Sequence, residues 1–129
     1  MSYIKHKSEE SVEDYLETIL ILSKRLPYVR SIDIANELSY SKPSISVAMK
    51  NLRVNDYITV SEEGYINLTE SGKELAKLIL DRHTTLSTML ISLGVDKETA
   101  IADACRMEHD ISPESFNAIK KHFNTIANK

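Results

Sequence analysis

The apolar residues of this chain recur with helical spacing along most of its length. In residues 11–26 they stand three and four positions apart, and Pro27 follows, so the pattern predicts a helix that ends there. Similar spacing between turn-forming residues predicts further helices at 31–39, 43–52, 69–94, 96–110 and 112–128. The chain is therefore expected to be mainly α-helical.

One segment breaks this period. Around "SEEG" in residues 57–69, apolar and polar positions alternate, which indicates two short strands and a turn with Gly64 where positive φ is tolerated. Helix, short helix, turn, helix and β-hairpin in this order is the winged helix-turn-helix arrangement. We expect a winged-helix domain at 1–72, followed at 73–129 by a connecting helix and a helical lobe.

In a winged helix-turn-helix domain the third helix enters the major groove of double-stranded DNA. Lys50 and Arg53 would contact phosphates further along this helix, while small side chains at its start would approach the bases. The alternative is a solvated basic helix on a protein that does not bind DNA. The predicted DNA-binding residues are Ser41, Lys42, Pro43, Ser44, Ser46, Val47, Lys50 and Arg53.

Composition limits where the protein acts. The 129 residues suffice for one core or two small lobes, 42% are apolar and 27% charged, and no apolar run approaches the roughly 18 residues of a membrane span. A single cysteine and a start without an apolar signal core favour the cytoplasm. Three glycines leave no room for a glycine-rich phosphate loop, so no nucleotide site is expected.

The stretch "DACRMEH" at 103–109 carries the most distinctive chemistry. Cys105, Glu108 and His109 share one helix face at spacings of three and four. They are compatible with a metal site, with a buried thiol beside two surface polar residues, or with a nucleophile and base. The enzyme interpretation lacks an orienting group and an oxyanion-hole loop, so we do not expect an enzyme.

A metal site requires ligands from elsewhere, since three from one helix rarely complete it. Asp14 and Glu17 stand three apart in the first helix, and His83 lies in the connecting helix. Carboxylates, imidazoles and a thiolate together suit a first-row divalent transition metal. Each also has a simpler explanation: first-turn acids, a surface histidine and a core cysteine.

These motifs together resemble the diphtheria-toxin-repressor and manganese-transport-regulator family of metal-dependent repressors, over about residues 11–123. The resemblance rests on "EDYLETI", "LTESGKELA", the "RH" pair at 82–83 and "ACRMEH", in that order. It implies a winged-helix DNA-binding domain, a dimer interface in the helices after about Gly94, and no SH3-like third domain. It also places six residues on metal-ligand positions: Asp14, Glu17, His83, Cys105, Glu108 and His109.

The chain departs from the family at several ligand positions. The aspartate at position 14 resembles the residue that the manganese sensors carry there, whereas the cysteine at position 105 resembles that of the iron sensors. The ligand set therefore resembles a hybrid of the two types. Ser87 and Ile101 do not match the ancillary site of the iron sensors. We expect a homodimeric repressor that Mn²⁺, or alternatively Fe²⁺, activates to bind a double-stranded DNA operator and so to control metal uptake. We expect no membrane and no small organic substrate among its partners. The competing hypothesis is a winged-helix regulator without a metal site that answers to an organic ligand or a protein partner.

Overall fold

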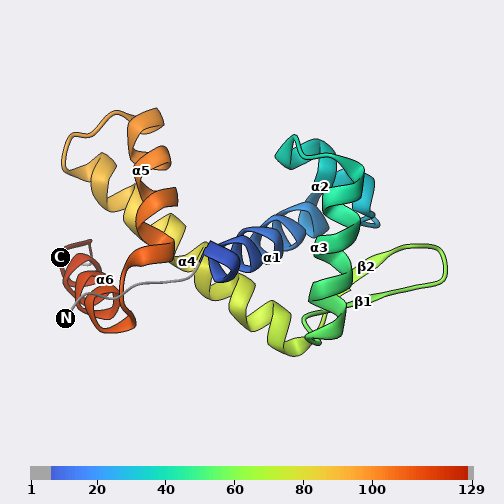
Figure 1. The fold of residues 1–129 in the computed structure, drawn as a ribbon. Coiled ribbons are helices and arrows are strands. Elements are labelled where there is room, and N and C mark those ends of the chain that lie inside the picture. Colours follow the sequence, from blue (N-terminus) through green and yellow to red (C-terminus); the bar gives the residue numbers. More distant parts are fainter. Residues whose placement is uncertain (1–6, 128–129) are drawn as a thin grey trace. The chain divides into compact units, whose positions relative to one another are not determined.

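The computed structural model describes the backbone of residues 7–127 and the side chains of residues 11–124. The fold is mainly α-helical, with one small antiparallel sheet, as Figure 1 shows. No helix in these residues is long and apolar enough to cross a membrane. The elements are α1 (Lys7–Arg25), α2 (Ser31–Leu38), α3 (Lys42–Val54), β1 (Ile58–Val60), β2 (Ile66–Leu68), α4 (Glu70–Ser92), α5 (Lys97–Asp110) and α6 (Pro113–Ala127).

The chain divides into two compact units, the first of which covers residues 7–78. Its core consists of aliphatic side chains that α1, α2, α3 and the hairpin bury at helical or strand spacing, as the sequence predicts. The strands pair with Ile58 opposite Leu68 and Val60 opposite Ile66, which buries Ile58 and Ile66. This unit is a winged helix, with α2 and α3 as the helix-turn-helix and β1–β2 as the wing.

The junction between the wing and α4 is tightly built. Thr69 caps α4 by accepting a hydrogen bond from the Gly72 N–H at 3.2 Å, and its own hydroxyl donates to the Asp56 carbonyl at 2.6 Å. A Cβ at Gly72 would lie 2.0 Å from the Tyr57 carbonyl oxygen. Glycine at this position therefore allows the start of α4 to lie directly against the chain that enters the wing.

The second unit begins at Ile79 and contains the remainder of α4 with α5 and α6. Leu86, Ala104 and Phe116, one from each helix, form its buried centre. Met89, Met107, Ile111 and Ile119 pack around them. An ion pair between Lys120 Nζ and Asp81 Oδ2 at 2.5 Å also joins α6 to α4. The helices of this unit therefore have fixed positions relative to one another.

Candidate metal centre and nucleic-acid interface

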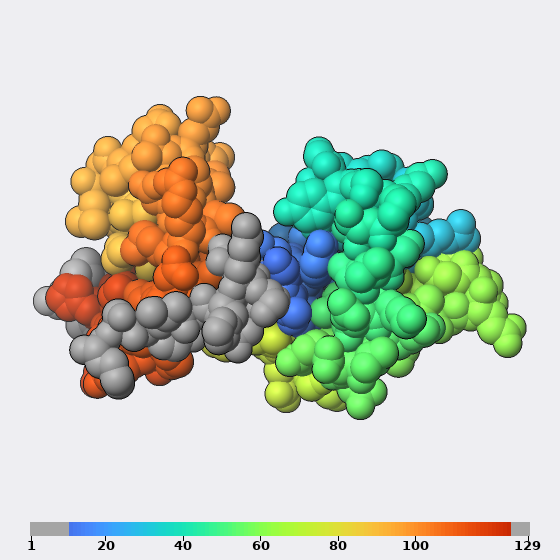
Figure 2. All heavy atoms as spheres, in the orientation of Figure 1, coloured from blue at the N-terminus to red at the C-terminus, as the bar shows by residue number. Residues whose placement is uncertain are grey.

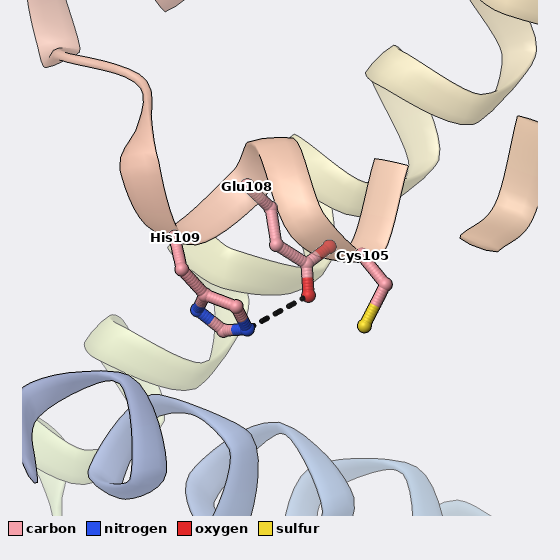
Figure 3. Close-up of side chains that lie close together, drawn as sticks. All are labelled: Cys105, Glu108 and His109. Carbon is pink, nitrogen blue, oxygen red and sulfur yellow. Dashed lines mark ion pairs between the residues drawn. The ribbon is translucent and has the colours of Figure 1, made fainter. Parts of the chain in front are cut away.

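Helix α5 brings Cys105, Glu108 and His109 together. Asp96 caps the helix by accepting a hydrogen bond from the Glu98 N–H at 3.2 Å. The three side chains extend from one face of α5 (Figure 3), and their candidate ligand atoms all lie within 4.8 Å of one another. Glu108 and His109 are 0% and 1% exposed, whereas the thiol is exposed. The interpretation of a buried thiol beside two surface polar residues is therefore wrong, because the burial is the reverse.

The Glu108 carboxylate lies between two imidazoles. Its Oε2 is 2.8 Å from Nδ1 of His83, which α4 contributes. Its Oε1 is 3.4 Å from Nε2 of His109 (Figure 3). Burial of a carboxylate is unfavourable unless positive charge or hydrogen bonds compensate for the lost water. His83 is thus more than the surface residue of the simpler explanation, since it contacts a fully buried acid.

Arg82, which precedes His83, fixes the end of α5. Its Nη1 donates to the carbonyl oxygens of Glu108 and Ile111, at 3.0 and 3.1 Å. Carbonyls in the last turn of a helix lack partners within the helix, and this guanidinium supplies them. Arg82 is 4% exposed and lies over the Phe116 ring, 5.5 Å from its centroid. The sequence interpretation used the "RH" pair only as a family motif and missed this role.

The residues of this unit fit a divalent metal ion. Glu108 Oε1 is buried and makes no hydrogen bond within the described part of the chain. A buried carboxylate oxygen in this state is suited to accept a cation, and imidazole nitrogen and cysteine sulfur stand beside it. Two imidazoles, a carboxylate and a thiolate form a donor set typical of transition metals rather than of Ca²⁺.

Asp14 and Glu17, the other predicted ligands, lie on α1 in the winged-helix unit, and both are half-buried. Because α1 begins at Lys7, they stand beyond its first turn, so their explanation as first-turn acids is wrong. Burial raises the pKa of neighbouring Tyr15, and the charges of Tyr40 and Asp14 raise it further. The metal-ligand role of Asp14 and Glu17 stays a prediction.

Helix α3 presents its predicted DNA-binding face to solvent. Ser39 ends α2 in the left-handed region with φ of 58°, and Ser41 caps α3 by accepting a hydrogen bond from the Ser44 N–H at 3.3 Å. Ile45, Met49 and Leu52 are buried beneath the helix. In Figure 2, α3 (green) lies on the surface of the winged-helix unit. All of the predicted contact residues are exposed: Ser41, Lys42, Pro43, Ser44, Ser46, Val47, Lys50 and Arg53.

Comparison with known proteins agrees with both parts of the structure. The family described as the N-terminal DNA-binding domain of iron-dependent repressors matches residues 8–66. The metal-binding and dimerisation domain of the same repressors matches residues 69–128. The chain is 34% identical to an HTH-type transcriptional regulator of Methanocaldococcus jannaschii. The matched region covers 86% of this chain and 90% of that regulator. It is also 32% identical to the regulator MntR of Bacillus subtilis, over a region that makes up 84% of this chain and 77% of MntR.

Solved structures share the fold. The manganese regulator SloR superposes with a TM-score of 0.77 at 27% identity, covering 88% of this chain and 53% of the solved one. IdeR of T. acidophilum superposes with a TM-score of 0.72 at 27% identity, covering 94% of this chain and 56% of the solved one. The chain thus spans about half the length of these two proteins.

A winged helix joined to a helical unit in which a buried carboxylate lies between two imidazoles is the arrangement expected of a metal-dependent DNA-binding regulator. The chain belongs to the iron-dependent repressor family and contains both the DNA-binding domain and the metal-binding and dimerisation domain of that family. Members of this family are DNA-binding transcriptional repressors rather than enzymes.

Proposed function

We propose that this protein is a cytoplasmic repressor that Mn²⁺, or alternatively Fe²⁺, activates to bind operators of metal-uptake genes. The observation that carries the proposal is the buried Glu108 carboxylate between His83 and His109, with Cys105 beside it. Relatives that bear the names MntR and manganese regulator SloR support manganese as the first candidate ion.

Four residues of the helical unit would hold the ion: His83, Cys105, Glu108 and His109. Family resemblance adds Asp14 and Glu17 from α1. A bound cation supplies two positive charges beside the buried carboxylate, which removes the electrostatic cost of leaving that acid ionised. If metal favours the DNA-binding form, DNA strengthens metal binding by the same factor, and such coupling is typically ~1–3 kcal/mol.

The donor set bears on which ion activates. Affinity in a mixed nitrogen, oxygen and sulfur site tends to rise from Mn²⁺ through Fe²⁺ to Zn²⁺, so tight binding does not identify the activating ion. Zn²⁺ is satisfied by four ligands, which His83, Cys105, Glu108 and His109 could supply. Mn²⁺ accepts about six ligands and would draw in the α1 carboxylates. We therefore expect Zn²⁺ to bind tightly and to activate poorly.

The proposed partner of each subunit is a second copy of the chain. Ile91, Leu93 and Ile101 are large apolar residues of the helical unit that are 42%, 73% and 41% exposed. They lie at the end of α4, just after it and in α5, within the range that matches the dimerisation domain. Burial of these side chains in a symmetric interface would remove apolar surface from water and stabilise a homodimer.

A direct test starts by selecting DNA fragments from the source genome with the Mn²⁺-loaded protein. Affinity for the enriched sequence is then measured in a metal-chelating buffer and with Mn²⁺, Zn²⁺, Co²⁺ or, without oxygen, Fe²⁺. We expect Mn²⁺ or Fe²⁺ to strengthen specific binding by about fivefold to 150-fold. Matched measurements on DNA of random sequence separate this effect from a general rise in affinity.

The competing hypotheses predict other outcomes. Specific binding of equal strength in every buffer would favour a winged-helix regulator that answers to an organic ligand or a protein partner. Strongest activation by Zn²⁺ would contradict the role assigned to the α1 carboxylates, while leaving metal dependence intact. A protein that stays monomeric at micromolar concentration with metal bound would contradict the proposed dimer.

A further inference from the structure

Three side chains, of which Tyr28 and Arg30 are exposed and Tyr65 is half-buried, form a stack at the base of the wing. The rings of Tyr28 and Tyr65 stack with their centroids 4.2 Å apart and an interplanar angle of 12°. The Arg30 guanidinium carbon lies 4.9 Å from the Tyr65 centroid, and its Nη2 donates to the Tyr65 hydroxyl at 3.2 Å. The core does not need this stack, since Tyr28 is 60% exposed and Arg30 is exposed.

Backbone contacts attach this stack to the wing. The Ile66 N–H donates to the Val29 carbonyl at 2.7 Å, so the segment that carries Tyr28 and Arg30 runs beside β2. The Arg30 N–H donates to the Asp33 carboxylate at 2.9 Å, where α2 begins. The main chain at Arg30 is therefore fixed on both sides, and Tyr65 restricts the orientation of its guanidinium.

The charge of Arg30 is available to a ligand. Arg25, the preceding arginine, is 2.8 Å from Glu37 in an ion pair. No carboxylate among residues 11–124 forms such a pair with the Arg30 guanidinium, which instead donates to the Tyr65 hydroxyl. An arginine held over an aromatic ring keeps its outward N–H groups free to donate to a phosphate.

The next residue along the chain lines a groove of positive charge. Ser31, Ser46, Lys50 and Arg53 line a groove of about 190 Å³ together with Met49 and Val60. It contains two cations and two hydroxyls and no acid. A phosphate backbone attracted to Lys50 and Arg53 would thus continue toward Arg30 along the start of α2.

The tip of the wing has the opposite charge. Residues 61–64 form its turn, in which Glu62 and Glu63 are exposed. A hydrogen bond from the Glu63 backbone N–H and one from the Ser61 side chain lower the pKa of Glu63. The wing (yellow-green) extends beyond the body of the winged-helix unit in Figure 2. Two carboxylates at this tip would repel the phosphates that a winged-helix hairpin approaches.

We propose that the wing binds DNA through its base: Arg30, positioned by Tyr65, donates to a backbone phosphate beyond Lys50 and Arg53, while the tip stays away from the duplex. This rests on the DNA-binding function and adds a contact outside α3. Arg30 is the binding residue, and Tyr65 acts through it. The sequence interpretation placed all DNA-binding residues in α3 and the residue before it.

The test compares Arg30→Gln with Lys73→Gln in the full-length, Mn²⁺-loaded protein. Lys73 is also an exposed cation of this unit, and it lines a separate groove beside α1 and β2, so its loss matches the change in charge. Fluorescence anisotropy would give the affinity for operator and random DNA between about 50 and 300 mM salt.

For Arg30→Gln we expect roughly threefold to tenfold weaker binding to both DNAs and a salt slope smaller by about 0.9 per lost contact, whereas Lys73→Gln keeps the wild-type slope. Circular dichroism should match wild type, because the Arg30 N–H to Asp33 bond is retained. An unchanged slope with Arg30→Gln would overturn the proposal. Absence of DNA binding by wild type would instead overturn the proposed function together with it.

Two further variants separate positioning and repulsion. Tyr65→Leu should weaken binding in the wild-type background and should have no added effect on affinity in Arg30→Gln, since Tyr65 acts through Arg30. The double substitution of Glu62 and Glu63 by Gln should leave affinity unchanged or raise it. Weaker binding after this loss of negative charge would show that the tip contacts DNA and would contradict the proposal.

Discussion

Replacement of Glu108 by glutamine separates a metal ligand from a structural acid. The side chain is 0% exposed, and glutamine has nearly its shape, so Glu108→Gln opens no cavity. The carboxylate contacts His83 at 2.8 Å, and its other oxygen makes no hydrogen bond within the described part of the chain. The neutral amide of the variant retains a hydrogen bond to His83, and its unsatisfied buried group lowers the stability of the fold by about 1–3 kcal/mol. The buried charge of the wild-type carboxylate lowers that stability by several kcal/mol.

Without metal, the variant should thus be at least as stable as wild type, and added metal should make wild type the more stable of the two. At ~100 times the dissociation constant, a bound ion stabilises the native state by about 2.7 kcal/mol. For a chain of this length, that corresponds to a rise in Tm of roughly 10 °C. We therefore expect Glu108→Gln to be as stable as wild type or more stable in a chelating buffer, and to lose most of the rise when Mn²⁺ is added.

Differential scanning calorimetry with and without Mn²⁺ measures the Tm in the chelating buffer and the rise in Tm that the metal causes. Glu98→Gln is the matched control, because Glu98 is an exposed acid of the same helix. The reasoning would be refuted if Glu108→Gln lowered Tm in the chelating buffer by several degrees and kept the full Mn²⁺ response. That result would make Glu108 a structural partner of His83 rather than a ligand.

Three further substitutions test other parts of the structure. Arg53→Gln should weaken binding to operator and random DNA alike and lower the salt slope by about 0.9, and changed base preference would contradict a phosphate contact. Cys105→Glu, at an exposed position, should alter stability by less than about 0.5 kcal/mol. In competition titrations it should weaken Zn²⁺ binding more than Mn²⁺ binding, and an unchanged ratio would exclude Cys105 as a ligand. Gly72→Ala should destabilise the winged-helix unit by about 1–3 kcal/mol or more in urea unfolding, since its Cβ would lie 2.0 Å from the Tyr57 carbonyl oxygen; wild-type stability would show that the wing junction adjusts.

The sequence predicts the helices well where capping residues flank an apolar pattern. The helices expected at 69–94 and 96–110 are α4 and α5, and Thr69 and Asp96 cap them. The prediction for α1 began at Ser11, but the helix begins at Lys7, because a turn of polar residues has no apolar period to reveal it. Helix α2 begins with Ser31, as the pattern predicts, but its cap is Arg30 rather than a hydroxyl residue, and the Asp33 carboxylate accepts the Arg30 N–H.

The candidate metal centre was less predictable than the fold. Spacing on one helix identified Cys105, Glu108 and His109 as neighbours, but polar residue types gave no reason to expect two of them to be buried. Their burial depends on helix packing between positions far apart in the sequence, because His83 and Arg82 contact Glu108 from α4. The interpretation of His109 as a surface polar residue is accordingly wrong, since it is 1% exposed.

The most direct test of the account is the ratio of operator affinities with and without Mn²⁺, measured for wild type and for His109→Gln. Glutamine limits the cavity that alanine would leave at this buried position, and it lacks the imidazole. We predict a ratio of at least about five for wild type and a ratio near one for the variant, with equal affinities in the chelating buffer. A variant that keeps the wild-type ratio would contradict the claim that this buried cluster binds the activating metal.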